Sequence, residues 1–290
     1  MALSELDSRS LLVRFYRTVK HDKGALVGLV FIGGIVVLVI LAPYVATNGP
    51  TEVNPQNRLL QPTLKGGYLL GGDQVGRCIF SRILWGGRMS LKIALLPIVF
   101  SLAIGVPLGM VSAYYGGYLD SFIMRCFDVL LSFPSILLAL AIAATLGPGM
   151  ENAILAVSVI SIPILARLTR GVTLEVKERD YVMAAIALGA PVWRILFRHV
   201  LANILAPLIV HATLEIGRVA IIAAGLSFLG LGVQPPTPDW GTMLAEGRNV
   251  IMVAPHVSTF PGIFLFVFCL GSNLLGDSLR DALDPTIVIR

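Results

Sequence analysis

The chain has 290 residues, of which 56% are hydrophobic and only 13% are charged, and its formal net charge is +5. Globular proteins carry about 25% charged residues, and a chain with a mean hydropathy of +0.84 has more apolar surface than a soluble fold can bury. The composition therefore excludes an ordinary soluble protein and indicates an integral membrane protein. The three cysteines lie far apart, which argues against a disulfide framework or a cysteine metal cluster.

Six segments are apolar over roughly the 20 residues that a helix needs to cross a bilayer. In chain order they are residues 25–47, 91–115, 121–146, 153–164, 205–229 and 260–275. Pro163 makes the fourth the shortest, and it is long enough only if it runs from about residue 151 to 167. The first has too long an apolar run for a signal peptide, so we expect a retained anchor. The sequence thus predicts an all-α polytopic protein with six transmembrane helices.

Basic residues are distributed unevenly between the two sides that six spans would create. Those that precede the first span are Arg9, Arg14, Arg17, Lys20 and Lys23. Most of the others fall on the same side, in the loops after the second and fourth spans and in the C-terminal tail. Because arginine and lysine concentrate on the cytoplasmic side, we expect both termini in the cytoplasm. The expected parts are an N-terminal arm at 1–24, a membrane domain at 25–285 and a tail at 286–290.

Two long segments would then lie on the outer side. Residues 48–88 are rich in Pro, Gly, Asn and Gln, which is typical of a structured surface loop. In residues 230–256 three prolines, at 235, 236 and 238, favour an extended path, and we expect Trp240 at the membrane interface. A short amphipathic helix at 241–252 would follow. We expect this second loop to pack over the outer mouth of the bundle, with docking of an external partner as the alternative.

The segment 168–202 is the one long polar interruption between apolar segments on the predicted cytoplasmic side. We expect Asp180 to cap a helix that the alanine-rich run 184–188 continues, and we expect Gly189 to end it. Pro191 suits the first turn of a second short helix. A helix–glycine–helix elbow with an alanine face suits insertion into a groove of another protein. The alternative is a plain hairpin between spans.

Two charged residues fall inside the fifth predicted span. Glu215 and Arg218 are three residues apart and share one helix face, where they can form an ion pair. Charges at this depth are costly unless they face a partner or a water-filled cavity. We expect them to line a translocation pathway, and a self-neutralised pair that locks helix packing is the alternative. In the third span, we expect Asp128 to pair with Arg125.

The sequence carries no signature of catalysis or of cofactor binding. It has no Gly-x-x-x-x-Gly-Lys-Ser/Thr run to hold nucleotide phosphates, and no His-Glu-x-x-His or Cys-x-x-Cys spacing for a metal. We therefore expect no catalytic residue, no cofactor and no metal site in this chain. An ion-coupled secondary transporter is a further alternative, although the two halves lack the internal repeat that such proteins carry. No pore loop or charged ring of a channel is evident.

Motifs spread over nearly the whole chain carry a family resemblance. The run Tyr-Val-Met-Ala-Ala at 181–185, followed by Gly189, resembles the Glu-Ala-Ala…Gly loop in the membrane subunits of binding-protein-dependent ABC importers. Six further runs are similar to segments of the C-type permease subunit of dipeptide, oligopeptide, glutathione and nickel importers. They lie at 70–77, 114–117, 124–128, 132–135, 227–241 and 273–285. The chain departs from the family pattern at Cys78 (usually Asp), Met183 (usually Glu) and Ala202 (usually Pro).

The resemblance implies a type I ABC importer transmembrane domain in a bacterial cytoplasmic (inner) membrane, with segment 168–202 as its cytoplasmic coupling-helix elbow. It implies half of a translocation pathway for short peptides, with nickel chelates or other small solutes as the alternative. The implied partners are a homologous second permease subunit, an external substrate-binding protein and two ATPase subunits that bind ATP and Mg, but no nucleic acid. The residues implied in ATPase coupling are Tyr181, Met183, Ala184, Ala185, Leu188 and Gly189.

Overall fold

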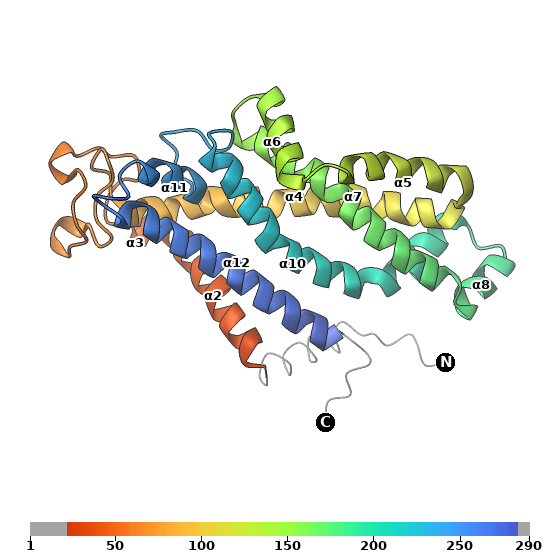
Figure 1. The fold of residues 1–290 in the computed structure, drawn as a ribbon. Helices are drawn as coiled ribbons and strands as arrows, with labels where there is room; N and C mark the ends of the chain where they lie inside the picture. Colours follow the sequence, from red (N-terminus) through yellow and green to blue (C-terminus); the bar gives the residue numbers. More distant parts are fainter. Residues whose placement is uncertain (1–21, 284–290) are drawn as a thin grey trace.

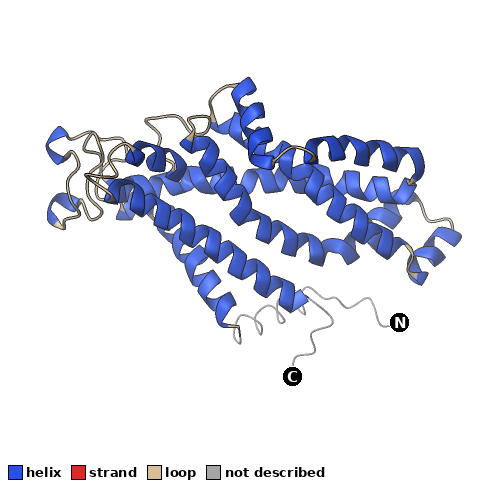
Figure 2. Cartoon of the chain, in the orientation of Figure 1, coloured by secondary structure: helices blue, strands red, loops and turns tan. Residues whose placement is uncertain are grey.

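The computed structural model describes residues 22–283, and nearly all of its regular structure is α-helix (Figure 1 and Figure 2). The predicted N-terminal arm up to residue 21 and the tail from residue 284 lie outside the described residues. The longest helices are α2 (Lys23–Ile40), α4 (Ile79–Tyr115), α7 (Met150–Lys177), α10 (Leu201–Phe228) and α12 (His256–Leu283). The shorter ones are α3 (Ala42–Val45), α5 (Gly117–Leu131), α6 (Ser135–Leu146), α8 (Asp180–Ala187), α9 (Val192–Arg194) and α11 (Trp240–Arg248). The remaining helical segments are the 3-10 turns η1 (Pro55–Asn57) and η2 (Lys65–Gly67) and the π-helical η3 (Ile195–Val200).

Five helical stretches are long and apolar enough to cross a membrane: α2, α4, α7, the stretch 192–228 that ends with α10, and α12. The pair α5 and α6 adds a sixth if it is counted as one span. Among residues 22–283 the only β-type pairing is a single bridge between Gly72 and Cys78, so the predicted all-α polytopic fold is confirmed. The short helices α8 and α11 lie at opposite ends of the bundle (Figure 1). We call these ends the α8 end and the α11 end.

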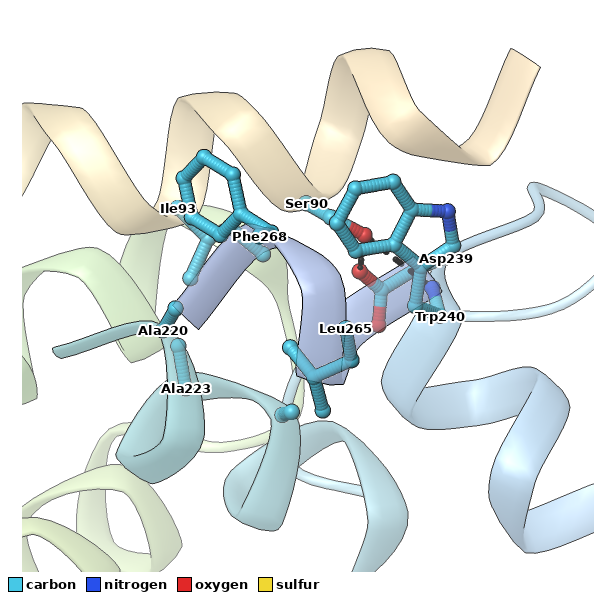
Figure 3. A pocket seen from close by; sticks show the side chains of 9 residues that line it. Ser90, Ile93, Ala220, Ala223, Asp239, Trp240, Leu265 and Phe268 are labelled. Carbon is cyan, nitrogen blue, oxygen red and sulfur yellow. Dashed lines mark hydrogen bonds between the residues drawn. The ribbon is translucent and has the colours of Figure 1, made fainter. Parts of the chain in front are cut away.

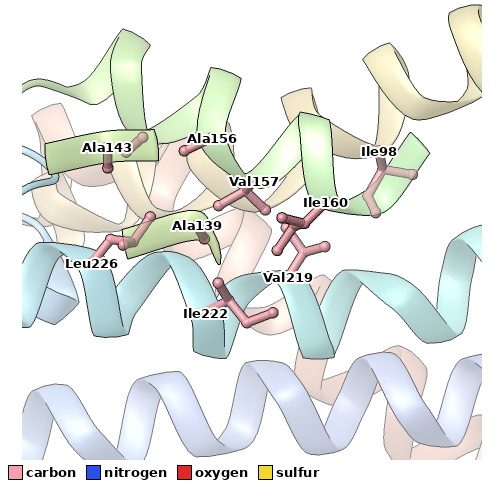
Figure 4. Packing of buried hydrophobic residues seen from close by; sticks show 10 residues of the cluster. Ile98, Ala139, Ala143, Ala156, Val157, Ile160, Val219, Ile222 and Leu226 are labelled. Carbon is pink, nitrogen blue, oxygen red and sulfur yellow. The ribbon is translucent and has the colours of Figure 1, made fainter. Parts of the chain in front are cut away.

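Helices α4 and α7 pack closely because glycines of α4 face α7. A Cβ on Gly105 would lie 3.0 Å from the carbonyl oxygen of Ile162, and one on Gly109 would lie 2.4 Å from that of Ala166. Small residues let membrane helices approach each other in this way. A buried apolar cluster joins these helices to α6 and α10 (Figure 4). Its members are Ile98, Ala139, Ala143, Ala153, Ala156, Val157, Ile160, Val219, Ile222 and Leu226.

The third predicted span, residues 121–146, is not one straight helix. It consists of α5 and α6, which meet at an angle of 90°. Pro134 lacks a backbone N–H and disfavours helical backbone at Phe133, so the helix stops at Leu131. The hydroxyl of Ser132 donates a hydrogen bond to the carbonyl oxygen of Val129 at 2.7 Å, which satisfies one carbonyl at the end of α5.

Two helices continue into segments whose charges indicated loops. Helix α4 begins inside the outer loop predicted at 48–88, and α7 continues past the start of the elbow predicted at 168. Arg82 of α4 forms ion pairs with Asp73 and Glu246. Arg170 of α7 forms one with Asp120. An arginine paired in this way is compatible with a packed helix, so these charges do not mark the ends of the helices.

Candidate functional site

Helix α8 lies at one end of the bundle, beyond the ends of α7 and α10 (Figure 1). Its N-cap is Arg179, which has an extended backbone with φ −72° and ψ 141°. Asp180 is therefore the first residue of the helix and not its cap, which corrects the prediction. A carboxylate in the first turn still stabilises a helix, because it interacts favourably with the positive end of the helix dipole.

Gly189 ends α8, as the sequence indicated. Its φ of +75° lies in the left-handed region that glycine adopts without steric cost. The Gly189 N–H donates to the Ile186 carbonyl at 2.9 Å. The Ala190 N–H donates to the Ala185 carbonyl at 3.0 Å. These two bonds form a Schellman motif, so the backbone itself fixes the turn of the elbow.

The six residues implied in coupling come together on α8 and the turn that follows it. They are Tyr181, Met183, Ala184, Ala185, Leu188 and Gly189. Met183 is 55% exposed and Leu188 is 87% exposed. Val182, by contrast, is fully buried in an apolar cluster that contains residues of α4, α7 and α10. The helix thus presents apolar side chains outward and is anchored to three spanning helices by its inner face.

The second helix of the elbow is not a separate unit. Pro191 is the N-cap of α9, which continues directly into η3 and then into α10. Ile195 and Val200 are buried, whereas Trp193 is 62% exposed. Segments of π-helix are frequent at functional sites. Here one links the elbow to a spanning helix with no intervening loop.

The predicted ion pair in α10 is present. Arg218 Nε lies 2.7 Å from Glu215 Oε2, and His211 Nε2 lies 3.8 Å from Glu215 Oε1. These side chains follow one face of α10, because they are spaced by four and three residues. The Glu215 side chain is only 15% exposed, and one terminal nitrogen of Arg218 has no hydrogen-bond partner among the described residues. The pair therefore keeps one unused donor.

Asp128 pairs with Arg167 of α7 and not with Arg125, which corrects the prediction. Helix spacing alone favoured Arg125, three residues away, but α5 packs along α7 and brings Arg167 within reach. Within residues 22–283, Arg125 makes no ion pair or hydrogen bond. A second link between the same helices joins Arg170 to Asp120, with two nitrogen–oxygen distances of 2.6 Å.

Four charged side chains at the α11 end form a network that sequence reasoning missed: Asp73, Arg77, Arg82 and Glu246. Arg82 is 1% exposed, and its two terminal nitrogens each lie 2.9 Å from an acid, one from Asp73 and one from Glu246. Burial raises the pKa of Glu246, and the nearby Arg77 opposes that shift. Asp73 and Arg77 belong to one of the family runs, but Glu246 is too distant in sequence for any spacing rule to find.

Trp240 lies inside the bundle and not at the membrane interface, contrary to the prediction. It is 1% exposed, and its indole N–H donates to the carbonyl of Ile83 at 3.1 Å. The preceding residue, Asp239, caps α11 and accepts a hydrogen bond from Ser90 at 2.6 Å (Figure 3). Burial raises the pKa of Asp239. The cavity beside these residues, about 10 Å³, holds no more than about one water molecule and is not a ligand site.

Comparison with known families decides what kind of protein carries this elbow. Residues 105–289 match the inner membrane component of binding-protein-dependent transport systems, and residues 10–62 match the N-terminal TM domain of oligopeptide transport permease C. The chain belongs to the binding-protein-dependent permease family. This permease is a multi-pass membrane subunit of an ABC importer, and it is not an enzyme.

Relatives with established names are similar over most of the permease. The dipeptide transport system permease protein DppC of Alkalihalophilus pseudofirmus is 44% identical over 270 residues, covering 93% of this chain and 88% of the relative. The di/tripeptide permease protein DppC of Pseudomonas aeruginosa is 45% identical over 282 residues, or 96% and 93% of the two chains. The glutathione permease protein GsiD of Pectobacterium atrosepticum is 49% identical over 220 residues, or 76% and 73%.

A solved structure supports the fold. The MetNI methionine ABC transporter in an inward-facing conformation has a chain that matches 70% of this permease, with 96% of that chain covered. The TM-score is 0.58 and the sequence identity is 19%. The likeness shows that the helices are arranged as in an ABC importer transmembrane domain.

Proposed function

We propose that this permease forms half of the translocation pathway of an ATP-driven importer for short peptides. The relatives are named for dipeptide, di/tripeptide and glutathione transport. Glutathione is itself a tripeptide, so short peptides are the substrate class that these names share. The permease lies in the bacterial cytoplasmic (inner) membrane with both termini in the cytoplasm, and the α8 end faces the cytoplasm.

The observation that carries the proposal is the exposed apolar surface of the elbow. Met183, Leu188 and Trp193 are all more than half exposed. Helix α8, which carries Met183, lies beyond the ends of α7 and α10 (Figure 1). Apolar helix faces of this kind bind in hydrophobic grooves of partner proteins. The partners at this end are the two ATPase subunits, which bind ATP and Mg. A homologous second permease subunit and an external substrate-binding protein complete the importer.

The packing of the elbow supports its proposed role in transmitting force. Val182 of α8 is buried in the same cluster as Val106 of α4, Leu165 of α7 and Ile204 of α10. Interiors packed in this way move as units and do not deform continuously. When ATP draws the two ATPase subunits together, the elbow follows, and the attached ends of the three spanning helices tilt. ATP drives this switch because it binds one state of the importer more tightly than the other.

The pair Glu215–Arg218 is the second part of the proposal, as a polar element of the pathway. Its partly exposed face on a spanning helix is costly in lipid but favourable toward a water-filled path. Replacing both residues, by Glu215→Gln and Arg218→Met, should lower peptide uptake without preventing assembly. Unchanged uptake by a normally assembled double variant would leave the pair with a packing role only.

Reconstitution tests the proposed function as a whole. Liposomes that contain this permease, the second permease and the ATPase subunits should take up a labelled dipeptide only when the binding protein and ATP are both present. Liposomes that lack the ATPase subunits should take up none. Dipeptide uptake by this chain alone, without ATP, would contradict the proposal and favour a secondary transporter.

A further inference from the structure

A groove of about 370 Å³ runs between α5 and α7, in the half of the bundle nearer the α8 end. Five of the residues that line it are charged: Asp120, Arg125, Asp128, Arg167 and Arg170. Small-molecule sites commonly have volumes of about 300–1,000 Å³. The groove is therefore large enough for a short peptide, and three arginines against two aspartates leave it with one excess positive charge.

The charges of this groove differ in how firmly they are held. Arg170 and Asp120 are joined by two short hydrogen bonds, and Ser112 also donates to Asp120, so this pair forms a fixed floor. Arg167 and Asp128 contact each other while about half exposed, at 52% and 55%. Arg125 is exposed and has no partner among the described residues. An exposed ion pair is weak, so a ligand with both charges can replace it.

The charges of the groove indicate that it does not face lipid. Arg167 and Asp128 are both about half exposed. Half-exposed charges face water or protein, because exposure to lipid would be costly.

We propose that this groove binds the free termini of a zwitterionic short peptide on its way through the membrane. Arg125 and Arg167 hold the carboxylate, since guanidinium groups bind carboxylates through paired N–H donors. Asp128 holds the ammonium group. The peptide inserts between Arg167 and Asp128, and each of its charged termini then lies against a side chain of opposite charge. No charged group loses its partner when the peptide binds, and the original ion pair forms again when the peptide dissociates. The pair Glu215–Arg218 is less exposed and therefore less accessible to a peptide.

The inference rests on the proposed function, and its test must therefore not depend on the binding protein or on ATP. Ser121 lines the groove and offers a position for a cysteine probe, Ser121→Cys, in a background with the exposed Cys126 replaced by serine. The assembled complex of both permeases and the ATPase subunits is labelled with a water-soluble thiol reagent. A matched control places the cysteine at Thr145, exposed on α6 and outside the groove.

Dialanine should slow labelling of Ser121→Cys about threefold when its concentration is about twice its dissociation constant, by simple occupancy. N-acetyl-dialanine amide, which has no charged termini, should not protect, and the Thr145→Cys control should be unaffected by either. Adding Arg125→Gln should abolish protection. That substitution removes no hydrogen bond or ion pair within the described residues, so it should leave folding intact, whereas Arg125→Lys should retain part of the protection.

Three outcomes would overturn the inference. Equal protection by the capped peptide would show that the termini are not recognised. Full protection in the Arg125→Gln variant would show that Arg125 does not bind the carboxylate. A Ser121→Cys probe that the reagent cannot reach in the peptide-free complex would show that the second permease covers the groove. Binding-protein-dependent dipeptide uptake by the same complex, measured in parallel, separates these failures from a failure of the proposed function.

Discussion

The two ends of this permease differ in how their charged side chains and their short helices are packed. At the α11 end, charged residues are buried and paired within the chain, and Trp240 is enclosed by Ile83 and its neighbours. At the α8 end, apolar residues such as Leu188 stand exposed on a short helix. A region that completes its own contacts is a rigid structural element, whereas a region that leaves apolar surface open is built to be completed by a partner. The buried network gives the first end a structural role, and the exposed face of α8 at the second end is the surface that we propose for coupling.

The largest expected effect is on stability at the α11 end. Arg82→Met removes a buried partner of two acids and should lower the free energy of unfolding by about 3–5 kcal/mol, as is typical when one member of a buried ion pair is lost. Thermal unfolding of the detergent-solubilised protein measures the change. The control is Arg88→Met, because Arg88 donates to the carbonyls of Val39 and Ile40 in α2 and lies over the Trp85 ring, but forms no ion pair within residues 22–283. Equal effects of the two substitutions would contradict the role given to the network.

A smaller effect is expected from the turn of the elbow. Gly189→Ala forces a Cβ into the left-handed backbone region and should destabilise the end of α8 by about 1–2 kcal/mol. No atom lies within 4 Å of the added Cβ, so the cost is in the backbone alone. Hydrogen exchange of the α8 amides should accelerate. Gly171→Ala in α7 is the control. Its added Cβ also has no atom within 4 Å, and its backbone is helical. Unchanged exchange in Gly189→Ala would mean that the turn is not what fixes α8.

The smallest effect is expected at Met183, where the family pattern usually has Glu. Because Met183 lies on an exposed face, Met183→Glu should change the free energy of unfolding by less than about 0.5 kcal/mol. It should preserve or increase the ATPase activity that substrate stimulates in the assembled importer. If the glutamate variant folds normally but abolishes transport, the interface has been rebuilt around methionine.

Hydropathy was enough to find the spans, and local chemistry was enough to find the elbow. Within residues 22–283, apolar length identified the stretches that are long and apolar enough to span, and the backbone preference of Gly189 located the end of α8. Helices α4 and α7 extend beyond the predicted spans, because a charged residue does not always lie in solvent. Arg82 and Arg170 are instead neutralised by acids far away in the sequence, and no local pattern reveals such partners.

The predicted pairing of Asp128 with Arg125 was wrong for the same reason. Sequence spacing favoured Arg125 on the same helix, and the partner turned out to be Arg167 on the next one. The break between α5 and α6 was, in contrast, available from the sequence, because Pro134 sits inside the apolar run and proline interrupts helices. Features fixed by a residue's own backbone can be predicted, whereas features fixed by contacts between elements need the fold.

The most direct test of the account is whether Leu188 joins the permease to its ATPase subunits. Leu188→Asp puts a charge into the proposed interface, and loss of a central apolar contact commonly costs 2 kcal/mol or more, which corresponds to about 30-fold weaker association. Copurification of the ATPase subunits with the permease measures it, and Met252→Asp, equally exposed at the α11 end, is the control. We predict that Leu188→Asp loses the ATPase subunits while Met252→Asp retains them. Full copurification and full substrate-stimulated ATP hydrolysis with Leu188→Asp would contradict the account.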